Sequence, residues 1–158
     1  MSKLLKYVLV ILSFNAHLAF AAVNETSLNS IEIDNAMLRA PIPGMANTAA
    51  YMEITNNTDK NITFVSAKSD YASKVEYHDH IMKDGVMKMV KLDSLEIKSG
   101  ETMKLQSGGL HMMFIGLTDP KQNVDYVNVT LITDNGAEIA TKLKVKSIHQ
   151  QHNQHKHH

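Results

Sequence analysis

Residues 75–90 of this chain have the sequence VEYHDHIMKDGVMKMV. The dipeptide Asp84-Gly85 is typical of a two-residue β-hairpin loop, in which both central residues take positive φ. With this dipeptide as the loop, the predicted strand pairs are Lys83 with Val86, Met82 with Met87, Ile81 with Lys88, and His80 with Met89. The stretch therefore predicts a β-hairpin of defined register.

The rest of the chain continues in short segments of alternating polarity, separated by turn residues. Strands are predicted at residues 31–33, 50–55, 62–67, 74–82, 86–92, 95–97, 102–105, 110–115, 126–133 and 138–145. Asn135-Gly136 predicts a second two-residue hairpin loop. No helical period of any length is present, so the pattern favours an all-β sandwich or barrel.

The first 21 residues are typical of a secretory signal peptide. Lys3 and Lys6 precede a short apolar run at residues 7–14, and Ala19-Phe20-Ala21 supplies small residues for cleavage before Ala22. The run is too short and too polar for a membrane span, although an uncleaved N-terminal anchor is the alternative. We therefore expect a periplasmic mature protein, residues 22–158, without stable membrane insertion.

Composition excludes several functional classes. The chain has 16 Lys and Arg and 16 Asp and Glu, so removal of Lys3 and Lys6 leaves 14 against 16, a formal charge of −2. This balance gives no indication of nucleic-acid binding. There is no cysteine, which rules out thiol oxidoreductase chemistry and a blue-copper thiolate site. The sequence also lacks a catalytic triad motif, a phosphate-binding loop and a nucleotide fingerprint, so we predict that the protein is not an enzyme.

Histidines and methionines gather on one predicted face of the hairpin. Because strand residues two apart share a face, His78 and His80 lie with Met89, and the pairing places His80 about 5 Å from Met89 at Cβ. His111 and Met113 likewise share one face of their strand, while Met112 points into the core. Imidazole and thioether donors suit Cu(I), so these strands predict a cuprous site where they meet.

Each of these histidines and methionines also has an explanation that involves no metal. Methionine is a common core filler, and we assign Met52, Met103 and Met112 to packing. Single histidines are more often solvated than metal-bound. Only the joint pattern favours a metal site.

The spacing His78-x10-Met89-x21-His111-x-Met113 resembles the signature of the PCuAC family of periplasmic copper chaperones. The similarity extends over about residues 30–146, and the segments that resemble family blocks are 36–52, 75–78, 84–89, 108–111 and 114–117. The resemblance implies a cupredoxin-like Greek-key β-sandwich or barrel as a domain within residues 22–146. It also implies that one Cu(I) is bound through these four residues. We expect the protein to be a monomer. Copper would be delivered to a cytochrome c oxidase subunit, or to an assembly chaperone of that enzyme.

His80 departs from the family pattern, because many members carry methionine two residues after the first histidine. We treat His80 as a candidate auxiliary ligand. The alternatives are a hydrogen-bond donor to one of the ligands, a ligand for copper after its oxidation to Cu(II), and a solvated residue at the rim. An added imidazole would favour Cu(II) and make binding more sensitive to acid.

Residues 147–158 form a predicted flexible tail that is too polar to fold alone. It contains His149, His152, His155, His157 and His158. Imidazoles without thioethers suit Cu(II), Ni(II) or Zn(II), so we expect a tail site for Cu(II). A solubilising tail is one alternative. In another, the protein is a periplasmic zinc, nickel or copper buffer that acts mainly through the tail.

Overall fold

The computed structural model describes residues 30–118 and 124–147. Within them the chain forms ten β-strands and no α-helix. The strands are β1 (Ile31–Arg39), β2 (Asn47–Asn56), β3 (Ile62–Lys68), β4 (Ala72–Lys83), β5 (Val86–Leu92), β6 (Leu95–Ile97), β7 (Thr102–Leu105), β8 (His111–Leu117), β9 (Tyr126–Thr133) and β10 (Glu138–Lys146). No described residue belongs to a helix with the length and apolarity of a membrane span.

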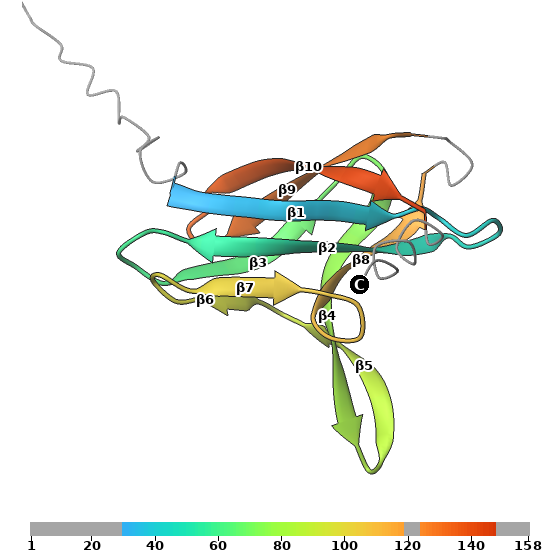
Figure 1. The fold of residues 1–158 in the computed structure, drawn as a ribbon, viewed down its shortest axis with the longest axis horizontal. Coiled ribbons are helices and arrows are strands. Elements are labelled where there is room, and N and C mark those ends of the chain that lie inside the picture. The colour runs from blue at the N-terminus through green and yellow to red at the C-terminus, as the bar shows by residue number, and fades with distance from the viewer. Residues whose placement is uncertain (1–29, 119–123, 148–158) are drawn as a thin grey trace, which may run out of the picture.

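Seven of these strands close into a barrel in the order β4-β8-β2-β1-β10-β9-β3, and β3 returns to β4 through the pair Ala67 and Val75. The β1–β10 pairing is parallel and every other one is antiparallel. β7 pairs with β2 and β6 with β3, while β5 pairs with β4 alone. The predicted cupredoxin-like β-barrel is confirmed, and the β4–β5 ribbon projects beyond it (Figure 1).

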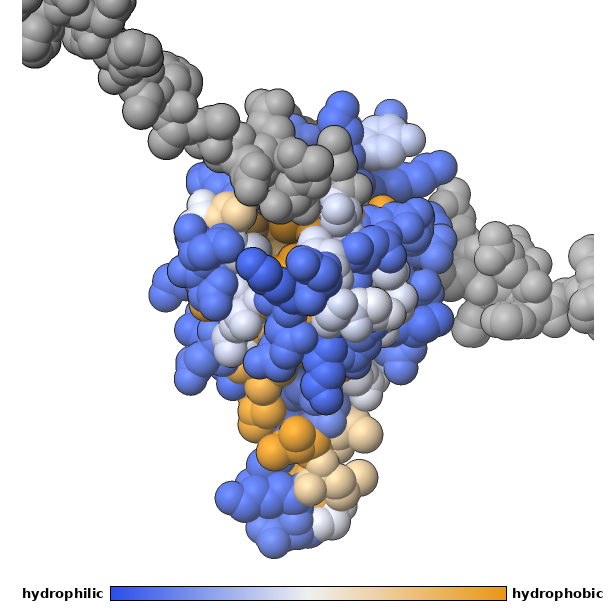
Figure 2. All heavy atoms as spheres, turned by 90° about the vertical axis from the view of Figure 1, so that its left-hand side faces the viewer, coloured by the Kyte–Doolittle hydropathy of each residue, from blue (hydrophilic) through white to orange (hydrophobic). Residues whose placement is uncertain are grey.

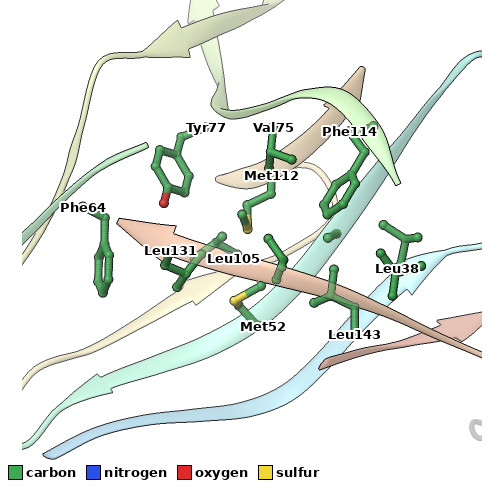
Figure 3. Packing of buried hydrophobic residues seen from close by; sticks show 14 of the residues in the cluster. Leu38, Met52, Phe64, Val75, Tyr77, Leu105, Met112, Phe114, Leu131 and Leu143 are labelled. Carbon is green, nitrogen blue, oxygen red and sulfur yellow. The ribbon is translucent and has the colours of Figure 1, made fainter. Parts of the chain in front are cut away.

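Side chains alternate between the two faces of each barrel strand, and those of one face fill the barrel interior. In β2 every second residue from Thr48 to Asn56 is buried, which is the period-2 pattern of a strand with one face in the core. Figure 3 shows Met52 and Met112 packed among Phe64, Phe114 and leucines in this core. Met103 packs against the same cluster. The assignment of these three methionines to packing is confirmed.

Two local predictions needed correction. β1 continues past Ile33 to Arg39 because a bulge between Asp34 and Met37, with Asn35 at φ 52°, interrupts the alternation without ending the pairing to β2. The Asn135-Gly136 loop contains three residues, Asp134 to Gly136. Gly136 takes positive φ and donates to the Thr133 carbonyl, so a type I turn followed by a glycine bulge replaces the two-residue turn.

Candidate metal site

The β4–β5 hairpin has the register that the sequence predicts. Asp84 and Gly85 take φ 54° and 75° as the two loop residues. His80 is paired with Met89, and Met82 with Met87. Because directly paired residues share a face, these four side chains belong to one side of the ribbon, as predicted.

β8 brings the second half of the motif beside this hairpin. It lies between β4 and β2, with His78 paired to His111 and Glu76 paired to Met113. Met112 and Phe114 are fully buried in the core, so His111 and Met113 belong to the opposite, outer face of the barrel. The prediction that Met112 points into the core while His111 and Met113 share the other face of the strand is confirmed.

The tight turn before β8 orients two imidazole rings. The carbonyl oxygen of Gly109 lies 2.7 Å from Nδ1 of His111 and 3.4 Å from Nδ1 of His80. A carbonyl can only accept, so Nδ1 of each ring is the protonated nitrogen in this arrangement and Nε2 retains its lone pair. The rings stack with centroids 5.1 Å apart and planes 21° apart. Because one backbone oxygen accepts from both Nδ1 atoms, the two Nε2 atoms are available to coordinate a metal ion.

His78 has a different partner. Its Nε2 donates to Oε2 of Glu76 at 3.0 Å, and Lys91 lies 3.3 Å from the other oxygen of the same carboxylate. The hydrogen bond from His78, with help from Lys91, lowers the pKa of Glu76 in opposition to its partial burial. The His78 ring is 6.1 Å from that of His111. With Nε2 held by Glu76, Nδ1 is the nitrogen that His78 has free for a metal.

A cavity of about 370 Å³ opens beside these residues. His80, Met89, His111 and Met113 line it, and His78 is not among its described lining residues. These side chains differ widely in exposure: His111 is 3% exposed, whereas Met89 is 49% exposed. A methionine exposed to this degree is not a core filler. The structure therefore brings two imidazoles and two thioethers to one partly open cavity, and a third imidazole, that of His78, lies next to His111.

Sequence reasoning missed the opposite wall of this cavity. Arg39, Met45 and Tyr51 line it, from the end of β1, the following loop and β2. Met45 is 52% exposed in a loop that contains two prolines and a glycine, where methionine has no core to fill. A methionine in such a loop was the feature of the sequence that could have indicated a role in the cavity. Glu76 was also missed as the partner of His78, although it lies two residues away on the same face.

Two predicted segments lie outside the described residues. They are the signal peptide, residues 1–21, and the histidines of the tail, which are His149, His152, His155, His157 and His158.

Comparison with known proteins gives consistent matches. The family model "Putative lipoprotein LpqE-like" matches residues 31–145. "Putative lipoprotein Lxx21020" of Leifsonia xyli subsp. xyli (strain CTCB07) is 29% identical over 119 residues, which cover 75% of this chain and 70% of that protein.

Two solved structures have the same fold. The solution structure of CuI-DR1885 from Deinococcus radiodurans is 30% identical with a TM-score of 0.56, covering 78% of this chain and 83% of that one. The copper-bound PCuAC domain from PmoF2 is 20% identical with a TM-score of 0.63, covering 76% and 95%. The chain therefore belongs to the LpqE-like family and has the fold of the PCuAC domain.

Proposed function

We propose that this protein is an exported copper chaperone that carries Cu(I) on the outer face of its barrel. The observation that carries the proposal is the convergence of His80, Met89, His111 and Met113 on one cavity. Soft thioethers and imidazoles are the donor set that Cu(I) accepts in low coordination numbers. Two similar proteins support the assignment because their structures contain copper: CuI-DR1885 and the copper-bound PCuAC domain from PmoF2.

The primary ligands are His78, Met89, His111 and Met113, with His80 as an auxiliary donor. His111 and His80 present Nε2 because Gly109 holds their Nδ1 atoms, and His78 presents Nδ1 because Glu76 holds its Nε2. Such outer partners fix the orientation of metal-binding imidazoles. The additional imidazole of His80 would also bind copper after oxidation to Cu(II).

The protein acts as a carrier and not as a catalyst. Met89 lies at the exposed side of the site, so an incoming thiolate or imidazole can bind the copper as this thioether leaves. Exchange of a thioether requires no proton. The acceptor is a copper-accepting protein of the periplasm, such as a cytochrome c oxidase subunit or its assembly chaperone.

A Cu(I) titration of the mature chain tests the proposal, in competition with a chromophoric chelator under anaerobic reducing conditions. The wild type should bind one equivalent tightly, and a quadruple alanine variant of His78, Met89, His111 and Met113 should lose it. Ile81→Ala is the matched control, because Ile81 is an exposed residue of β4 on the other face of the hairpin. Equal affinity of the wild type and the quadruple variant would refute the core site.

The His-rich tail supports a second candidate function, a zinc, nickel or copper buffer. Its five histidines would capture Cu(II) beside a core that holds Cu(I). Deletion of residues 147–158 separates the two functions. A chaperone retains its tight Cu(I) equivalent after the deletion and loses only the Cu(II) bound by the tail, whereas a buffer loses all metal binding.

A further inference from the structure

The end of the β4–β5 hairpin carries two methionines that the proposed site does not use. Met82 and Met87 are 67% and 58% exposed, and they are direct partners across the ribbon. Figure 2 shows that apolar side chains gather on this projecting part of the molecule. The exposed apolar residues there include Ile81, Met82, Val86, Met87 and Met89.

The two faces of the hairpin differ in chemistry. On the site face, the four positions nearest the loop are His80, Met82, Met87 and Met89, and every one carries a side chain that can coordinate copper. The opposite face carries Asp79, Ile81, Lys83, Val86, Lys88 and Val90, with no histidine or methionine. If apolar contact were the only requirement, valine or isoleucine would serve as well as methionine, and the hairpin has these residues on its other face. The segregation therefore indicates coordination chemistry.

The geometry suits two-coordinate Cu(I). Directly paired residues have Cβ atoms about 5 Å apart, and the unbranched methionine side chain lets two sulfur atoms converge on one ion. The Met82–Met87 pair follows the His80–Met89 pair by two residues, about 7 Å along the strand. Soft donors thus continue from His111 on the barrel wall to the exposed end of the hairpin.

We propose that Met82 and Met87 form a second, weaker Cu(I) site through which copper enters and leaves the central site. Cu–S bonds to Met82 and Met87 form as the Cu–S bonds to Met89 and Met113 and the Cu–N bonds to the imidazoles break. The copper remains Cu(I), so the step transfers no electron. Two thioethers leave coordination positions open for a donor from the acceptor protein. The role of Met82 and Met87 in copper transfer rests on the proposed function, whereas the existence of a Cu(I) site at these two residues does not.

The test uses the mature full chain with ¹³C-labelled methionine methyl groups, titrated anaerobically with Cu(I) through several equivalents. The first equivalent should shift the methyl signals of Met89 and Met113. Further copper should then shift those of Met82 and Met87 together, and Met82→Leu/Met87→Leu should lose only this second response. Unmoved Met82 and Met87 signals at every ratio would overturn the pair site. Unmoved Met89 and Met113 signals would instead overturn the central site.

A kinetic measurement tests the route. Leucine preserves apolar bulk, so the double leucine variant should bind the first equivalent with unchanged affinity but transfer it to bathocuproine disulfonate several-fold more slowly. Val86→Leu, on the opposite face of the same hairpin, is the matched control and should transfer at the wild-type rate. Equal rates for the double variant and the wild type would overturn the role of the pair in transfer.

Discussion

His78 and His111 are direct partners across β4 and β8, with ring centroids 6.1 Å apart and planes inclined at 40°. Glu76 binds the first ring and the Gly109 carbonyl binds the second. The two imidazoles are therefore oriented by different groups, one a side chain and the other a backbone carbonyl, and the side chain of Glu76 can be substituted without changing the other contact.

Glu76→Gln should weaken Cu(I) binding by about 10–100-fold, because loss of an outer partner of a metal-binding histidine typically has that effect. The variant removes the carboxylate that fixes Nε2 of His78. Chelator competition measures the affinity. In a His78→Ala background the same substitution should change little, and an equal loss in both backgrounds would show that Glu76 does not act through His78.

His80→Met should retain tight Cu(I) binding and weaken Cu(II) binding, because a thioether replaces the nitrogen that stabilises the oxidised ion. Cu(II) electron paramagnetic resonance with a competing ligand measures the second effect. His80→Phe is the control, since it keeps a ring against His111 without a donor. Unchanged Cu(II) spectra in both variants would place His80 outside the coordination sphere.

Met112 and Met113 are neighbours with opposite expected phenotypes. Met112→Ala should lower the free energy of unfolding of the copper-free protein by about 2–5 kcal/mol, because Met112 is fully buried and alanine leaves a cavity. Met113→Ala should lower stability much less but abolish tight Cu(I) binding. Urea denaturation and copper titration of both variants check the pair. Reversed phenotypes would contradict the assignment of the two faces of β8.

Gly116→Ala should destabilise the barrel by about 1–3 kcal/mol or more, since positive φ strains any other residue. Gly116 has φ 66°, and an added Cβ would lie 2.6 Å from Oγ of Ser73. Urea denaturation measures the loss. Ser73→Ala in the same chain should recover only part of it, because the backbone strain remains. Full recovery would mean that the clash alone matters.

The local parts of this fold could be predicted from the sequence. All ten strands were recognised, and the hairpin register followed from Asp84-Gly85 and the period of two. The pairing of His78 with His111 was not predicted, because β4 and β8 meet only in the closed barrel and no turn links them. The same holds for Met45, which reaches the cavity on a loop whose path depends on the whole barrel.

The proposed copper ligands lie on the outside of a barrel whose interior is complete without them. A change of donor, such as the histidine at position 80, therefore leaves the packed interior intact. Single substitutions among these ligands can therefore change the metal preference of related proteins without causing them to misfold. The same separation would let one molecule bind and release copper repeatedly, because loss of the ion leaves no gap in the packed interior.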